Sequence, residues 1–213
     1  MVFTENIVEL IKLFLNPKVI KYNSIPLAYM DKEKIKKAII ELLKAIDEDP
    51  NRPELKKTPD RVARMYEELL SGKDQDTKNI LQVTQNLEHN GVVLIKNVPF
   101  YSICEHHMLP FFGDCHIAYI PNNNKVVGIS KLARVIDIVS RRLQVQERLT
   151  TEIADTIMKN LKPKGVAVAV NARHLCIEMR GIKKPGTYMV TTDVRGKFEK
   201  DTKARREFLK LIK

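Results

Sequence analysis

Two short segments rich in cysteine and histidine constrain this chain more than any other feature. They read Cys104-Glu105-His106-His107 and His174-Leu175-Cys176, and they lie about 70 positions apart. Thiolate and imidazole are ligands that zinc prefers, and the Cys104-x-x-His107 spacing suits chelation. If the second segment is a strand, its first and third residues face the same side and both point into one site. We therefore expect the fold to bring the two segments together around one metal ion.

The five potential ligands allow either a structural or a catalytic site. In a structural site, four of them close a tetrahedron around zinc. In a catalytic site, three bind the metal, and a water that the metal acidifies takes the fourth position. Spare histidines beside a metal suit proton transfer, so the ligands alone favour catalysis only slightly. The further pair Cys115-His116 lies in a strand-like run, where a small buried cysteine without a ligand role is the simpler interpretation.

The pattern along the chain predicts an α+β fold with a helical N-terminal part. Residues 1–30 contain two prolines and are expected to form an arm, followed by a helical region over 31–90 and an α+β domain over 91–213. Apolar residues at helical spacing predict helices over 31–49 and from Thr58 to Gly72, and later from Ser130, over 146–161 and from about Asp201. Asp31, Thr58 and Ser130 are the expected N-caps. Strands are expected at 92–95, 114–120, 126–129, 166–171 and 188–192.

Charge and cysteine content narrow the function further. The chain has 37 Lys and Arg against 26 Asp and Glu, a formal net charge of +11, which favours anionic partners such as a nucleotide or a nucleic acid. Three cysteines form no disulfide framework, which favours a reducing compartment. The N-terminal apolar stretch at 7–15 is interrupted by charges and too short to cross a bilayer. We therefore expect a cytoplasmic protein without a membrane partner.

Four sequence blocks, Ser102–His107, Gly128–Arg134, Gln144–Thr150 and His174–Gly181, together resemble the signature of the GTP cyclohydrolase I family. The similarity runs from about Asp31 to the C-terminus, with the blocks in the family's order and spacing. It implies hydrolysis of GTP to 7,8-dihydroneopterin triphosphate and formate, the first step of tetrahydrofolate and pterin biosynthesis. It also implies the tunnelling fold, in which an antiparallel sheet carries helices on one face and oligomerisation completes a barrel. Family members form a decamer of two pentamers with active sites at subunit boundaries.

The resemblance also implies roles for individual residues. Cys104, His107 and Cys176 would bind Zn²⁺, and His106 and His174 would act as acid and base beside it. The guanine edge would be read by Gln146 and Glu147. The triphosphate would be held by Ser130, Lys131, Arg134 and Arg180, and Arg61 would reach the site of a neighbouring subunit.

The residues themselves fit this assignment without requiring it. Several Lys and Arg donors can neutralise a triphosphate, and a helix start such as that at Ser130 favours anions. On sequence alone, however, a solvated helix face is the preferred interpretation of Lys131 and Arg134. Glu147 fits equally well as a carboxylate favoured by a helix N-terminus. The chain has no G-x-x-x-x-G-K-[ST] loop, which argues against a GTPase that hydrolyses the γ-phosphate.

Two alternatives belong to other classes. A non-catalytic zinc protein that binds nucleic acid would use the same charge and ligands, but no basic stripe alternates with aromatic residues and Trp is absent. Another pterin enzyme of the same fold would use three histidine ligands or a cysteine without metal. The stretch at 182–189 departs from the Ser/Thr-rich strand usual in the family, and Asp193 and Arg195 stand where smaller or apolar residues are common. The packing and oligomer contacts of this strand are therefore expected to differ from the family pattern.

Overall fold

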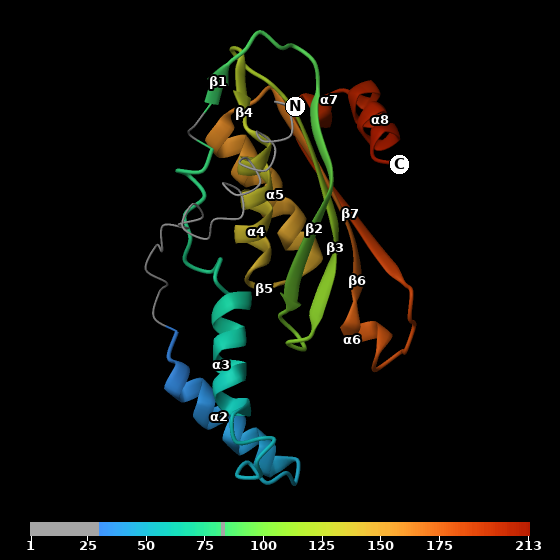
Figure 1. Ribbon diagram of the computed structural model, residues 1–213. Helices are drawn as coiled ribbons and strands as arrows, with labels where there is room; N and C mark the ends of the chain where they lie inside the picture. Colours follow the sequence, from blue (N-terminus) through green and yellow to red (C-terminus); the bar gives the residue numbers. More distant parts are fainter. Residues whose placement is uncertain (1–29, 82–83) are drawn as a thin grey trace, which may run out of the picture.

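The computed structural model describes residues 30–81 and 84–213, so most of the expected N-terminal arm lies outside the described residues. Figure 1 shows a helical hairpin below a curled sheet that is flanked by helices. The helices are α2 (Lys32–Ala45), α3 (Thr58–Leu69), α4 (Ile129–Ser140), α5 (Gln146–Leu161), α6 (Leu175–Glu178), α7 (Lys197–Lys200) and α8 (Thr202–Leu211). The strands are β1 (Thr84–Asn86), β2 (Val93–Cys104), β3 (Pro110–Ile120), β4 (Lys125–Val127), β5 (Leu143–Gln144), β6 (Gly165–His174) and β7 (Tyr188–Gly196). No helix in this described part is long and apolar enough to cross a bilayer.

The main sheet has the strand order β5-β2-β3-β6-β7, and every neighbouring pair is antiparallel except β2 with β5. β2 and β3 are 12 and 11 residues long, much longer than the runs expected at 92–95 and 114–120. An irregularity between Ile95 and Val98 breaks the register, and Asn97 there has a φ of 58°. This bulge interrupts the alternation of apolar and polar residues, so the sequence pattern did not predict the second half of β2.

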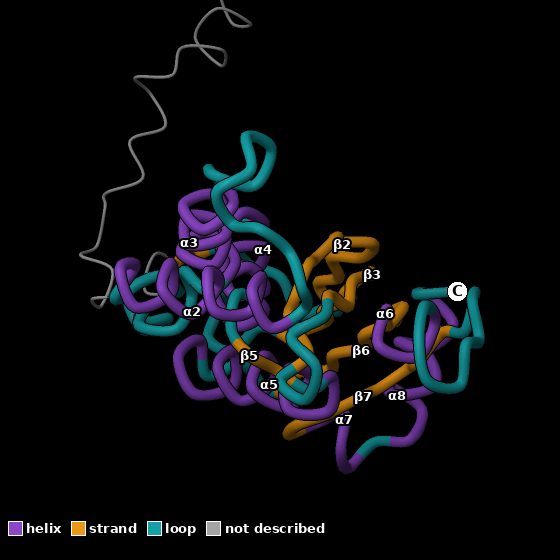
Figure 2. Tube along the Cα trace, turned by 90° about the horizontal axis from the view of Figure 1, so that it is seen from below, coloured by secondary structure: helices purple, strands orange, loops and turns teal. Residues whose placement is uncertain are grey.

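Helices cover the sheet on both faces, but unequally. α4 and α5 pack against one face through a large apolar core that includes Phe111, Ile136, Ile153 and Val168. On the opposite face, α7 and α8 cover one end through Phe198 and Phe208 (Figure 2). The mixed α+β class is confirmed, whereas the expectation of helices on one face alone holds only for α4 and α5. Completion of a barrel by further copies stays a prediction.

The helix starts agree only partly with the expected N-caps. Asp31 caps α2, because its carboxylate accepts the backbone N–H of Lys34 at 3.0 Å. The expected caps at Thr58 and Ser130 are wrong by one or two residues: Lys57 and Gly128 hold these positions, and neither donates or accepts a capping hydrogen bond through a side chain. Thr58 and Ser130 lie instead in the first turn of their helices.

The helical hairpin α2–α3 joins the rest of the fold through Gly72. Its N–H donates to the carbonyl of Arg141, and its carbonyl accepts from Nε of Arg142, each at 3.0 Å. A Cβ at this position would lie 2.0 Å from the carbonyl oxygen of Ile138. Gly72 was expected to stop the helix, but α3 ends at Leu69, and the glycine is needed for this close approach.

Candidate metal centre

Cys104, His107 and Cys176 form a compact group of metal-ligating side chains. Their ligand atoms all lie within 4.8 Å of one another, and Sγ of Cys104 is 3.7 Å from Nδ1 of His107. Cys104 ends β2, His107 lies in the turn before β3, and Cys176 lies in α6. The fold therefore brings the two distant segments together, at the lower edge of the sheet in Figure 1.

A tight turn after β2 directs His107 back towards Cys104. The backbone N–H of Met108 donates to the carbonyl of Cys104 at 2.8 Å, and that of Cys104 donates to Leu109 at 2.9 Å. Met108 itself has a φ of 53°, in the left-handed region. The chain thus reverses within four residues, which gives the Cys-x-x-His spacing its chelating geometry.

Cys176 reaches the group by a route that the sequence did not predict. The expected strand over His174 and Cys176 is wrong: β6 ends at His174, and α6 begins at Leu175. An ion pair spans this transition, because Arg173 donates from Nε and from a terminal nitrogen to the two carboxylate oxygens of Glu178 at 2.8 and 2.5 Å. Cys176 is therefore held within a short closed segment between Arg173 and Glu178.

The geometry of the three side chains fits a zinc ion. With Zn–S about 2.3 Å and Zn–N about 2.0 Å, tetrahedral coordination places sulfur and nitrogen about 3.5 Å apart, close to the 3.7 Å between Cys104 and His107. Burial raises the pKa of the Cys176 thiol, and the neighbouring Cys104 raises it further. A bound cation would offset both effects and allow the two sulfurs to be thiolates. Within the described residues the group has three members, the number typical of catalytic zinc sites with an open position.

The two spare histidines lie beside this group in different surroundings. The side chain of His106 is 64% exposed, and its Nε2 lies 3.9 Å from the Glu105 carboxylate. His174 is half-buried, stacks on Phe111 with ring centroids 4.7 Å apart, and bonds through Nε2 to Oε1 of Gln146 at 2.8 Å. Burial lowers the pKa of His174, while the Glu147 and Glu178 carboxylates act against this shift.

A second ion pair supports the turn that carries Cys104 and His107. Arg148 on α5 donates to the carboxylate of Glu105, which holds the pKa of Glu105 below its ordinary value. Arg148 also donates through Nε to Oε1 of Gln144 at 2.8 Å, and the carbonyl of Gln144 accepts the N–H of Glu105. Sequence reasoning missed Glu105, Arg148, Arg173 and Glu178, because charged residues in turns and on helix faces read as solvated surface.

The residues expected to contact substrate fall into two groups. Glu147 and Arg180 are exposed near the ligands, close enough to influence the pKa of His174 and Cys176 respectively. The Gln146 side chain is buried and engaged in hydrogen bonds within the chain, so its expected contact with guanine stays a prediction.

Ser130, Lys131 and Arg134 lie in the first half of α4, away from the metal group. The metal end of α4 is its C-terminus, where the carbonyl of Ser140 accepts the hydroxyl of Ser102 at 2.6 Å. At a rise of 1.5 Å per residue, Ser130 and Lys131 lie about 15 and about 14 Å along the helix axis from Ser140, and Arg134 about 9 Å. Arg61 is exposed in the first turns of α3, on the helical hairpin. One chain therefore does not bring all expected site residues together.

Comparison with known proteins identifies the family. The family model of GTP cyclohydrolase I matches residues 35–213. The chain belongs to the GTP cyclohydrolase I family. GTP cyclohydrolase 1 of Caldanaerobacter subterraneus subsp. tengcongensis is 55% identical over 183 residues, covering 86% of this chain and 97% of the relative. GTP cyclohydrolase 1 of Clostridioides difficile is 53% identical over 184 residues, covering 86% and 97%. Among solved structures, archaeosine synthase QueF-Like in the apo form matches 51% of this chain and 97% of its own, with a TM-score of 0.41 and 18% identity.

The departures from the family pattern on β7 have a structural explanation in this chain. Asp193 accepts hydrogen bonds from Arg195 and, at 2.7 Å, from the hydroxyl of Thr151. Arg195 also donates through Nε to Asp155 at 2.8 Å. Thr151 and Asp155 lie on α5, so these unusual residues connect β7 to the helix that begins at Gln146.

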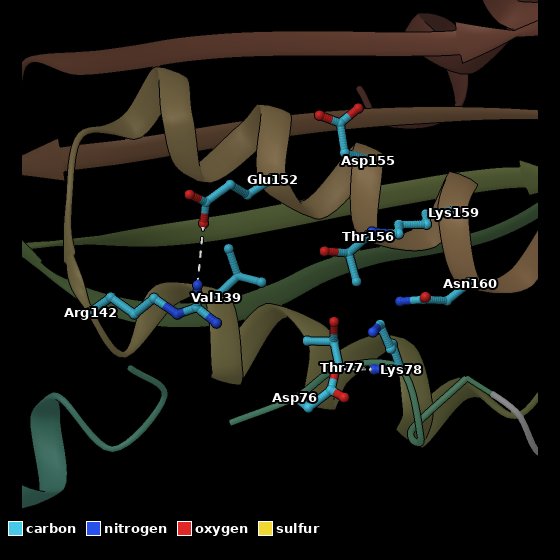
Figure 3. A pocket seen from close by; sticks show the side chains of 10 residues that line it. All are labelled: Asp76, Thr77, Lys78, Val139, Arg142, Glu152, Asp155, Thr156, Lys159 and Asn160. Atoms are coloured by element: carbon cyan, nitrogen blue, oxygen red, sulfur yellow. Dashed lines mark hydrogen bonds and ion pairs between the residues drawn. The ribbon is translucent and has the colours of Figure 1, made fainter. Parts of the chain in front are cut away.

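A separate polar pocket lies between the 76–78 segment, α4 and α5 (Figure 3). Acidic and basic side chains both line it, and Arg142 lies 3.7 Å from Glu152 across one end. None of the residues that the GTP cyclohydrolase I resemblance assigns to the site lines this pocket. Glu152 also accepts a hydrogen bond from Nε2 of Gln144 at 3.0 Å. Because the carbonyl of Gln144 accepts the N–H of Glu105, this end of the pocket is linked to the turn that carries Cys104.

Proposed function

We propose that this member of the GTP cyclohydrolase I family hydrolyses GTP to 7,8-dihydroneopterin triphosphate and formate at a Zn²⁺ ion bound by Cys104, His107 and Cys176. The observation that carries the proposal is the convergence of these three donors, from segments about 70 positions apart, within 4.8 Å. Three protein ligands leave a coordination position open, as hydrolytic zinc sites require. The family match over residues 35–213 supplies the substrate class.

The side chains around the three ligands account for the proton transfers. When bound, the zinc ion supplies Lewis-acid activation of the hydrolytic water. Water adds to C8 of guanine while His106 or His174 protonates N7; the C8–N9 bond then breaks, N9 takes up a proton, and a formamide remains on N7. Hydrolysis of this amide releases formate, after which the ribose opens, rearranges and recloses on the freed amine to give the product. Positioned acid–base groups of this kind contribute ~10²–10⁴ in rate. The exposed carboxylate of Glu147 accepts from guanine N1–H and the exocyclic amine, which places C8 towards the ligands.

The triphosphate requires several cationic donors, and we propose that two copies of the chain supply them. Arg180 lies beside Cys176 in the same chain. Ser130, Lys131 and Arg134 lie far along α4, so they serve the metal centre of a neighbouring copy, as Arg61 does from the hairpin. Exposed apolar residues on the hairpin, Leu42 at 54% and Ile46 at 60%, suit a subunit contact. A decamer of two pentamers is the assembly that we propose.

The direct test incubates purified protein with GTP, with and without a chelator, and follows formate and pterin fluorescence. We expect product only from metal-loaded protein. Cys104→Ala and Cys176→Ala should each lose both zinc and turnover, because either change leaves two ligands. Formate release by either variant would contradict the zinc assignment. Binding of DNA or RNA without any formate production would favour a nucleic-acid-binding zinc protein instead.

Glu147→Ala tests the proposed guanine contact. Removing the carboxylate should raise the Kd for GTP by about 10-fold or more, since guanine then loses a charged acceptor. Bound zinc, measured by atomic absorption, should stay equimolar because Glu147 lies outside the ligand group. Unchanged GTP affinity in this variant would show that guanine is read elsewhere.

A further inference from the structure

Neighbouring backbone carbonyls fix the orientation of the Gln146 side-chain amide. Gln146 is the first residue of α5 and is 1% exposed. Its Nε2 lies 3.1 Å from the carbonyl oxygen of Val170 and 2.9 Å from that of Met189. Carbonyl oxygens only accept hydrogen bonds, so the amide nitrogen must face them. The amide oxygen therefore faces the other way, towards His174.

This orientation specifies which ring nitrogen of His174 carries a hydrogen. Oε1 of Gln146 lies 2.8 Å from Nε2 of His174, and an amide oxygen can only accept. Nε2 must then be the donor, and in the neutral ring Nδ1 is the nitrogen without hydrogen. The plane of the ring is held as well, because it stacks on Phe111 at an interplanar angle of 3°.

Two threonines close the arrangement into a ring of hydrogen bonds. The hydroxyl of Thr150 donates to the backbone carbonyl of Gln146 at 2.8 Å, which uses its single hydrogen. Thr191 must therefore donate to Thr150 across 2.6 Å, and its oxygen accepts from Nε2 of Gln146 at 3.2 Å. Since Gln146 and Thr150 are both buried, little water competes for these bonds.

We propose that Gln146 is a positioning residue for His174 and that its side chain makes no contact with guanine. If the proposed function holds, each of two adjacent residues has one task. The buried Gln146 fixes the Nε2–H form of His174 and presents the bare Nδ1 to the substrate as a proton acceptor, which leaves His106 as the donor to N7. The exposed Glu147 reads the guanine edge.

The first test separates catalysis from binding in the zinc-loaded enzyme. Gln146→Met keeps the length and packing of the side chain but removes the acceptor for His174. We expect kcat for formate release to fall about 10- to 100-fold, as for other groups that orient an active side chain, with the Kd for GTP within about 2-fold of wild type. Thr156→Val is the matched control: it removes one hydroxyl from α5 in the separate pocket, outside this ring of hydrogen bonds, and should retain kcat within about 3-fold.

The second test uses His174→Ala as the background. If Gln146 acts only through His174, adding Gln146→Met should change neither the residual formate rate nor the calorimetric Kd for GTP. A Kd that weakens about 10-fold or more in the double variant would overturn the proposal in favour of a guanine contact. Absence of formate from the wild-type enzyme would instead refute the proposed function, so the two failures are distinct.

A spectroscopic measurement covers the case in which Gln146→Met does not fold. In wild-type protein labelled with ¹⁵N-histidine, the ring of neutral His174 should show a protonated Nε2 and a bare Nδ1, assigned by comparison with His174→Ala. The opposite tautomer would overturn the proposal, because a bare Nε2 cannot donate to the amide oxygen.

Discussion

At the scale of single residues, the ligands are held by charged neighbours that do no chemistry themselves. Arg148 holds Glu105 on the turn of Cys104, and Arg173 holds Glu178 around Cys176. The side chain of Glu178 is 6% exposed, so its pairing with Arg173 is shielded from solvent. Such supporting groups keep the ligands close to their coordination geometry before the metal arrives, which lowers the cost of binding it.

Glu178→Gln should weaken zinc binding without removing a ligand. The neutral amide keeps the volume of the carboxylate but loses the bidentate pairing with Arg173, so Cys176 becomes less well positioned. We expect the zinc affinity, measured by competition with a chromogenic chelator, to fall about 10- to 100-fold. Glu207→Gln on α8 removes the same charge far from the site and should leave affinity unchanged. Equal affinities for wild type and Glu178→Gln would show that the ion pair has no such role.

The metal ligands were predictable from the sequence, and their supports were not. Spacing and residue type predicted that the two segments meet around a metal but left five candidate ligands open. The family resemblance selected Cys104, His107 and Cys176, and the structure groups these three side chains. Glu105 and Glu178 differ from ordinary surface carboxylates only in the arginines that they face. Those partners are set by the register of β6 and the start of α5, which no local pattern encodes.

At the scale of elements, the stability of β7 depends on its hydrogen bonds to α5. Burial raises the pKa of Asp193, but hydrogen bonds from Arg195 and Thr151 outweigh this effect and the pKa is lowered overall. In the unfolded chain an aspartate titrates near ~3.9. Because the folded pKa is the lower one, the added stability is present above about pH 4 and disappears as pH falls through the folded value.

Asp193→Asn should therefore reduce stability at neutral pH but not in acid. We expect a loss of about 1–3 kcal/mol at pH 7, typical of a hydrogen-bonded charge that loses its partner, and a difference from wild type that shrinks below about pH 4. Thermal unfolding followed across pH checks both. Asp155→Asn breaks an exposed ion pair with the same arginine and should reduce the free energy of unfolding by less. A loss that is equal at pH 7 and pH 3 would contradict the electrostatic explanation.

Elements with regular periodicity were predicted well, and junctions were not. α5 begins and ends where its apolar spacing predicts, at Gln146 and Leu161. The passage from β6 into α6 was missed because four residues are too few to show a helical period. The role of Gly72 depends on the approach of α4, a contact between segments about 65 positions apart, so it was taken for a simple helix stop.

At the scale of the whole molecule, the expected site is divided between the two ends of α4. The ligands lie at the C-terminal end of α4, and the proposed phosphate donors lie at its N-terminal end. If two copies complete each site, a chain that lacks ligands can still lend its donors to a neighbour.

Mixing two inactive variants tests this division. Cys104→Ala removes a ligand, and Lys131→Ala removes a phosphate donor; each alone should release little formate. After the two are dissociated and reassembled together in equal amounts, about a quarter of the sites should combine an intact ligand set with an intact donor set. Light scattering confirms that mixed oligomers have formed. Mixed oligomers without recovered activity would place both groups in the same copy.

The separation of the two ends of α4 then makes activity depend on how much of the protein is present. Where the two ends of one helix serve different centres, a lone chain has no competent centre, and turnover per chain must depend on protein concentration. Dilution would then lower the turnover per chain without unfolding any chain. A substitution that only weakens the contact between subunits would lower the rate in the same way as the loss of a catalytic group.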